Sequence, residues 1–253
     1  MDGKHITIQK PALSGSTYFN YKSTCSILLL AVVDADYKFT YIDVGAYGRE
    51  HDSGVFARTA LSSRLENGTL NLPPTDNGGS FCFVADEAFP LREYLMRPYP
   101  GERGIGGGHL PEEVQVFNYR LSRARRVSEN AFGILVAKWR IFRQPIMARP
   151  QTVEKVVKAA CVLHNFLRRR DGLSNDRQYV GTGEVDNDDG QGGPQPGTWR
   201  QHAGAGIHQL GRVGANMHSR RAAAARDKLA EYFVSPAGAV PWQRAVIRRG
   251  RQQ

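Results

Sequence analysis

Three acidic side chains stand where the sequence could build a metal site. Asp86 directly follows an apolar run at 81–85, and open α/β sheets place ligands at the carboxyl ends of buried strands. Asp2 adjoins the alternating pattern HITI, and Glu129 is the single acid among eight Lys and Arg over 120–149. Converging carboxylates bind Mg²⁺ or Mn²⁺, and two such ions about 3.5–4 Å apart support phosphodiester hydrolysis or strand transfer.

Each acid also has an ordinary structural interpretation. Asp86 could cap a helix that begins at PLREYLM, and Asp2 could be a solvated residue near a chain terminus. Glu129 could pair with Arg125, four residues earlier on the same helix face. The residue types and positions alone leave both readings open.

The excess of positive charge favours a polyanionic partner. The chain carries 34 Lys and Arg against 24 Asp and Glu, a net charge of +10, and basic groups that neutralise phosphates release counterions. A solvated helix face would explain the charge near Glu129 but not its uniform sign. The predicted DNA-backbone contacts are Arg120, Arg123, Arg125, Arg126, Lys138, Arg140 and Arg143.

The elements that must position these groups follow from hydrophobic periodicity. Short strands at 5–8, 26–33 and 39–44 predict an antiparallel meander, and 81–85 predicts a further buried strand. Apolar residues at three- and four-residue steps predict helices over 118–139 and from 152 onward. The fold class is therefore α/β, with a mixed sheet flanked by helices.

Composition divides the chain into three parts. Residues 1–170 form the predicted domain, 171–216 a Gly-, Asp- and Asn-rich disordered linker, and 217–253 a basic tail with a short helix. Three cysteines without a CxxC pair give no sign of zinc or redox chemistry. The longest apolar run, 27–33, is too short to cross a bilayer, so no membrane association is expected.

Three further features invite structural explanations. His164 lies beside the apolar stripe of the second helix and is predicted to be a satisfied structural histidine rather than a ligand. Gly133 inside a helix predicts close packing, against the sheet, near Glu129. The glycine-rich segment 101–109 lacks a GK[ST] ending and is expected to be a loop rather than a phosphate cradle.

The ordered set of motifs resembles the DDE endonuclease domain of Harbinger-type transposases and the proteins derived from them. These stretches cover most of residues 2–170 and read DGKHITIQKP, NYKSTCSILLLAVVDADYKFTYIDVGAYGREHDSGVF, VADEAFPLREYLMRPYP, FNYRLSRARRVSENAFGIL, KWRIF and LHNFL. The resemblance implies that Asp2, Asp86 and Glu129 are the catalytic metal ligands. It also implies an RNase H-like fold, nuclear location, cleavage of DNA with Mg²⁺ or Mn²⁺, and a Myb-like DNA-binding partner.

One departure from the family pattern bears on the expected activity. Family members carry an apolar run before the first aspartate, whereas this chain begins one residue before Asp2, so we expect a domain truncated at its N-terminus. The first hypothesis is a metal-dependent DNA nuclease. The alternatives are a domesticated or decayed nuclear protein that binds DNA or chromatin without cutting, and a basic RNA-binding protein.

Overall fold

The computed structural model divides the chain into two compact units, which are described separately. The first comprises residues 1–63, 126–187 and 196–212, and the second 64–125, 188–195 and 213–253. The structure describes residues 1–73, 81–101, 110–171, 178–202, 204–209 and 219–250. Most of the glycine-rich segment, 102–109, lies outside the described residues.

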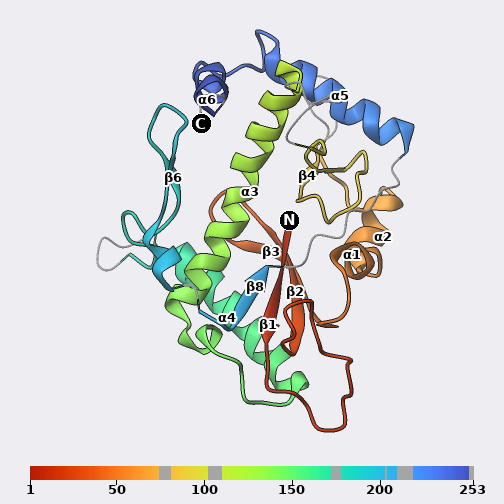
Figure 1. Cartoon of the computed structure of the whole chain (residues 1–253), viewed down its shortest axis with the longest axis vertical. Helices are drawn as coiled ribbons and strands as arrows, with labels where there is room; N and C mark the ends of the chain where they lie inside the picture. The colour runs from red at the N-terminus through yellow and green to blue at the C-terminus, as the bar shows by residue number, and fades with distance from the viewer. Residues whose placement is uncertain (74–80, 102–109, 172–177, 203, 210–218, 251–253) are drawn as a thin grey trace. The chain divides into compact units, whose positions relative to one another are not determined.

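A four-stranded antiparallel sheet forms the centre of the first unit, in the order β3-β2-β1-β8 (Figure 1). Its strands are β1 (Asp2–Thr7), β2 (Ser26–Val33), β3 (Phe39–Tyr47) and β8 (Ile207–Gln209). The register pairs Asp2 with Ala31 and His5 with His208. The predicted meander of the first three strands is therefore confirmed.

The two faces of this sheet follow from the alternation of side chains along each strand. Ile27, Leu29 and Ala31 of β2 belong to the main buried core, as does Ile6 of β1. Since residues two apart share a face, Asp2 and Lys4 project from the same face of β1 as Ile6. The site residues on β1 therefore point toward the core that the helices cover.

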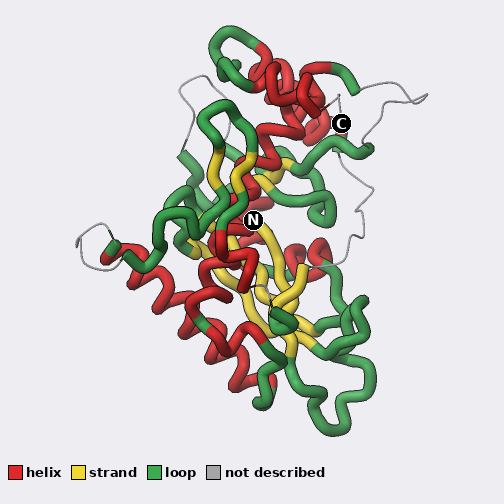
Figure 2. Tube along the Cα trace, turned by 60° about the vertical axis from the view of Figure 1, so that its left-hand side comes forward, coloured by secondary structure: helices red, strands yellow, loops and turns green. Residues whose placement is uncertain are grey.

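Two long helices supply the other side of that core. α4 (Pro150–Arg170) begins with proline at its first helical position and packs against β3, as the long helix beside the yellow strands in Figure 2 shows. α3 (Glu112–Lys138) contributes Phe132 and Leu135 to the same core from its second half. The remaining helical elements of this unit are α1 (Asp52–Ala57), the start of α2 (Ala60–Glu66), η1 (Arg140–Arg143) and η2 (Thr198–His202).

The second unit holds the parallel pairing that the sequence placed in the central sheet. β4 (Phe83–Val84) pairs in parallel with β5 (Leu95–Met96), and the two strands form a separate sheet. The predicted buried strand at 81–85 is thus wrong in extent, because Phe81 is 51% exposed and the chain turns at Asp86. Phe117 of α3 packs in the core of this unit with Leu91 and Met96.

The stretch predicted to be a disordered linker differs from that expectation in its described residues. Residues 178–202 and 204–209 are structured and contain β6 (Asn187–Asp188), β7 (Pro194–Gln195), η2 and β8. Few large apolar residues hold them; hydrogen bonds from α3 and pairing with β1 do so instead. Composition misses this, because it registers apolar content and not long-range polar partners.

The predicted basic tail also packs into a core. It contains α5 (Arg220–Val234) and α6 (Gln243–Gly250), and Ala222 and Ala230 of α5 are buried in the core of the second unit. Ser219 caps α5 by accepting a hydrogen bond from the Ala222 backbone N–H at 3.1 Å. The tail therefore forms part of a folded unit rather than an appendage.

Candidate functional site

Asp2 is a buried carboxylate on the helix-covered face of β1. The residue is 4% exposed, and its Oδ1 accepts a hydrogen bond from the Gly3 backbone N–H at 2.8 Å. Oδ2 lies 2.9 Å from the Lys4 Nζ but is buried without a well-aligned hydrogen bond. A buried charge is costly unless it is compensated, so the Lys4 ammonium is the cation that balances Asp2 in this structure.

Lys4 brings Asp2 into the neighbourhood of Glu129. The Lys4 ammonium lies 5.4 Å from the ring centroid of Phe132 on α3, and Lys4 and Glu129 line one pocket of about 420 Å³ in the first unit. Trp199 and Arg200 of η2 line the same pocket. Lys4 thus pairs with Asp2 and lines the same pocket as Glu129.

The surroundings of Glu129 are built by a polar network on α3. Asn130 is 2% exposed and receives a hydrogen bond from the Trp199 Nε1 at 3.0 Å. The Asp186 carboxylate, with a smaller contribution from Glu129, raises the pKa of Arg200. Lys4 and Arg200 therefore place positive charge in the pocket that Glu129 lines.

Gly133 explains how the Trp199 ring reaches α3. A Cβ on Gly133 would lie 2.2 Å from the Trp199 ring, so only glycine permits this contact. The predicted close packing at Gly133 is present, but the partner is the indole of η2 rather than the sheet. The sequence could not reveal this, because Trp199 lies in the stretch expected to be disordered.

Asp86 lies in the second unit, just after β4. Its Oδ1 accepts a hydrogen bond from the Ala88 backbone N–H at 3.0 Å, which closes a local turn, and its Oδ2 lies 3.8 Å from the Arg125 guanidinium. Arg125, which the structural interpretation of the sequence made the partner of Glu129, thus lies close to Asp86.

The convergence of the three acids stays a prediction. Asp2 and Glu129 belong to the first unit and Asp86 to the second. Within the part of the chain that the structure describes, no three His, Cys, Asp or Glu side chains form a group that could hold a metal ion.

The seven predicted DNA contacts divide between the two units. In the second unit, Arg123 forms an ion pair with Asp188, and Arg120 donates to the Gln243 side chain and lies over the Phe233 ring at 4.7 Å. In the first, Lys138 lies 2.6 Å from the Glu184 carboxylate. The others are Arg125 near Asp86, Arg126 bonded to the Asn187 carbonyl, Arg140 exposed on η1 and Arg143 bonded to α3 carbonyls.

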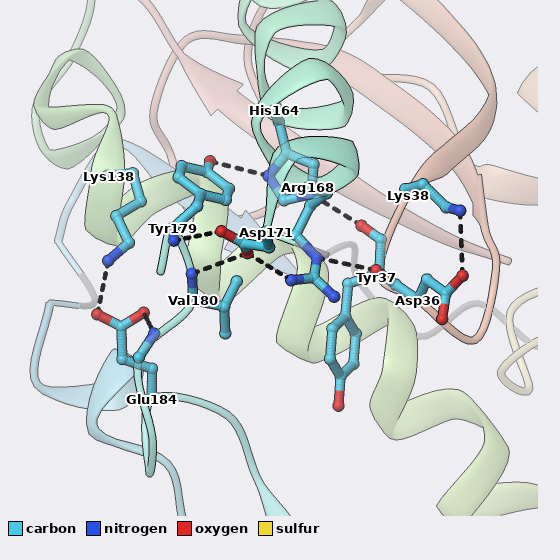
Figure 3. A network of polar contacts seen from close by, with 11 residues as sticks. Asp36, Tyr37, Lys38, Lys138, His164, Arg168, Asp171, Tyr179, Val180 and Glu184 are labelled. Atoms are coloured by element: carbon cyan, nitrogen blue, oxygen red, sulfur yellow. Dashed lines mark hydrogen bonds and ion pairs between the residues drawn. The ribbon is translucent and has the colours of Figure 1, made fainter. Parts of the chain in front are cut away.

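His164 is a structural residue, as its sequence context predicts. The side chain is fully buried, with Nε2 donating to the Tyr37 carbonyl at 2.8 Å and Nδ1 accepting from the Tyr179 hydroxyl at 3.0 Å (Figure 3). Because a carbonyl can only accept, these partners specify the neutral tautomer with its proton on Nε2. Burial lowers the pKa of His164 to about 4.

This shift predicts loss of stability in mild acid. The unfolded chain binds a proton near pH 6.5 and the folded chain only near pH 4, so the contribution of His164 is present above pH 6.5 and is lost as the pH falls toward 4. Between pH 7 and 5 this loss amounts to about 2 kcal/mol. Urea unfolding at both pH values should show a smaller loss for His164→Gln than for wild type; an equal loss would contradict the assignment.

Sequence reasoning missed two contributors to the site. Lys4 was visible within the DGKH motif, and a basic residue two positions after an acid on one strand face signals a local ion pair. Arg200 gave no such signal, because Arg200 and its partner Asp186 both lie in a stretch of linker-like composition.

The sequence matches one protein family and two curated proteins. The profile of the DDE superfamily endonucleases matches residues 1–165. "Protein ALP1-like" of Arabidopsis thaliana is 28% identical over 176 residues, which cover 66% of this chain and 42% of that protein. "Putative nuclease HARBI1" of Xenopus laevis is 24% identical over 176 residues, which cover 68% of this chain and 46% of that protein.

These matches cover only part of each relative. The chain spans less than half the length of either curated relative, and no solved structure matches it. Among the described helices, none has the length and apolar character needed to cross a membrane. The chain belongs to the DDE superfamily endonucleases, and the predicted resemblance to a Harbinger transposase-derived nuclease domain is confirmed.

Proposed function

We propose that this chain is a divalent-metal-dependent DNA endonuclease core, with Asp2, Asp86 and Glu129 as the metal ligands. The observation that carries the proposal is the Asp2 carboxylate, whose Oδ2 is buried without a well-aligned hydrogen bond and lies 2.9 Å from the Lys4 ammonium. Carboxylate oxygens are the donors that Mg²⁺ and Mn²⁺ prefer, so the residues fit such an ion. When bound, the metal would supply an activated water and stabilisation of the leaving oxygen.

The chain's own side chains would then bind and orient the DNA. Lys4, which lines the pocket with Glu129 and pairs with Asp2, would contact a phosphate if a metal took its place as the counterion of Asp2. The basic groups of α3 and η1 would hold the DNA backbone on either side of the cleaved bond. We further propose that the meander β3-β2-β1 with its covering helices is the RNase H-like core; nuclear location and a Myb-like partner stay predictions.

Nicking of supercoiled plasmid tests the activity directly. The whole chain in Mn²⁺ should convert supercoiled DNA to the nicked form, and EDTA should abolish the reaction. In parallel, Mn²⁺ should raise the thermal midpoint of the protein, because a ligand that binds only the folded state stabilises it. DNA binding with neither nicking nor Mn²⁺ stabilisation would contradict the proposal and favour a non-catalytic DNA-binding protein.

A further inference from the structure

The segment that follows α4 presents acids to the basic residues of α3. We call residues 179–202 the strap; they include Glu184, Asp186 and Asp188 at two-residue spacing. In the first unit, Glu184 pairs with Lys138 at 2.6 Å, and the Asn187 carbonyl accepts a hydrogen bond from Arg126 at 3.3 Å. In the second unit, Asp188 pairs with Arg123. Three of the predicted DNA contacts therefore bind the strap in this structure.

Uncharged contacts hold the strap in register on α3. Asn130 donates to the Asp186 carbonyl at 3.0 Å and accepts from the Asp186 backbone N–H at 2.9 Å, and Trp199 packs on Gly133. These two contacts, at Asn130 and Gly133 of α3, determine which acidic residue of the strap faces which basic residue of the helix. The arrangement is thus a specific docked segment rather than a chance meeting of charges.

The start of the strap is tied to α4 by a separate network, shown in Figure 3. The Asp171 carboxylate accepts hydrogen bonds from Arg168 and from the backbone N–H groups of Tyr179 and Val180, and the Tyr179 hydroxyl donates to His164. None of these hydrogen bonds involves a basic residue of α3, and the one contact of such a residue with the anchor among the described residues is the Lys138 ammonium, 5.8 Å from the Tyr179 ring centroid. The strap could therefore leave α3 while its first residues stay attached to α4.

We propose that the strap is a built-in competitor of DNA, whose carboxylates occupy Lys138 and Arg123 until DNA phosphates replace them. The inference rests on the proposed DNA-binding function. The pairs are well suited to exchange, because the Lys138 and Glu184 side chains are both more than a quarter exposed, and exposed ion pairs are individually weak. Phosphates gain in addition from counterion release, which the internal carboxylates do not provide.

Neutral variants of the strap test the competition. Glu184→Gln with Asp188→Asn should bind a 30-base-pair duplex about tenfold more tightly than wild type at low salt, with EDTA present to prevent cleavage. Asp36→Asn with Glu231→Gln changes the net charge equally at exposed positions outside the strap, and should leave affinity nearly unchanged. Equal gains in both double variants would show a general charge effect and overturn the proposal.

An uncharged variant separates strap release from net charge. Gly133→Ala places a Cβ against the Trp199 ring, while alanine itself favours the helix over glycine. We expect tighter DNA binding and faster hydrogen exchange of the backbone amides over 184–187, matching the exchange that DNA induces in wild type. Wild-type affinity in both Gly133→Ala and the neutral strap variant would overturn the proposal.

The outcome for the strap is distinguishable from the outcome for the nuclease. Tighter binding by the strap variants without any nicking in Mn²⁺ would contradict the proposed nuclease function and support the strap proposal. Nicking by the chain, together with a DNA affinity that the strap variants leave unchanged, would contradict the strap proposal and support the proposed nuclease function. Absence of DNA binding in every variant would overturn the strap proposal.

Discussion

Glu129→Gln is expected to reduce Mn²⁺-dependent nicking by about 10²- to 10³-fold, the usual cost of removing one preorganised electrostatic group. The amide has the shape of the carboxylate but neither its charge nor its affinity for a hard cation. Glu129 is only partly buried and lines a pocket with Lys4 and Arg200, so the fold should tolerate the change. Asp86→Asn should give a loss of similar size, since asparagine preserves the turn to Ala88.

The matched control is Glu113→Gln, the same chemical change in the first turn of the same helix. It should retain wild-type nicking, and all three variants should keep the wild-type thermal midpoint within a few degrees. Unchanged nicking by a folded Glu129→Gln protein would remove this residue from the site. Equal loss in Glu113→Gln would show that the effect comes from α3 as a whole.

Lys4→Met is expected to lower the free energy of unfolding by about 3 kcal/mol, because it leaves the buried Asp2 carboxylate without its counterion. Asp2→Asn should cost a comparable amount by stranding the Lys4 ammonium. The double variant should be more stable than the sum of the two losses predicts, since replacing both members of a buried pair is often close to neutral. Urea unfolding of the wild type, the two single variants and the double variant provides the free energies for this double-mutant cycle.

Mn²⁺ extends this cycle to the proposed ligand role of Asp2. If Asp2 binds the metal, Mn²⁺ should restore much of the stability lost in Lys4→Met, because the ion supplies the missing positive charge. It should restore little in Asp2→Asn, which has lost the ligand. Equal responses of the two variants to Mn²⁺ would place the metal elsewhere, and additive losses without Mn²⁺ would refute the coupling between Asp2 and Lys4.

The parts of the fold that sequence could predict are those with a local repeat. β2 reads as eight consecutive residues rich in Val, Ile and Leu, and α4 repeats its buried positions at helical spacing through Val153, Val157 and Ala160. Their extents are recovered closely because each signal lies within the element. The predicted extent of β4 was wrong because Phe81 belongs to the same apolar run as Phe83 and is nevertheless exposed.

The parts that sequence could not predict depend on partners far along the chain. β8 has three residues, Ile207 to Gln209. It forms a strand by pairing with the free edge of β1, about 200 positions earlier in the sequence. The charge row on α3 predicted a phosphate-binding surface, but nothing local indicates that Glu184 lies against Lys138. The candidate acids were recognisable from motif and position, whereas the pocket around Glu129 required the strap.

The Trp199 indole that lies against Gly133 gives the molecule an optical property. The chain has three tryptophans, and the other two, Trp139 and Trp242, can be replaced by phenylalanine to leave one emitter on the strap. Its ring lies against the helix on one side and 4.5 Å from the Arg200 guanidinium. Emission from this single indole would then record, in real time and without a label, when η2 leaves the surface of α3.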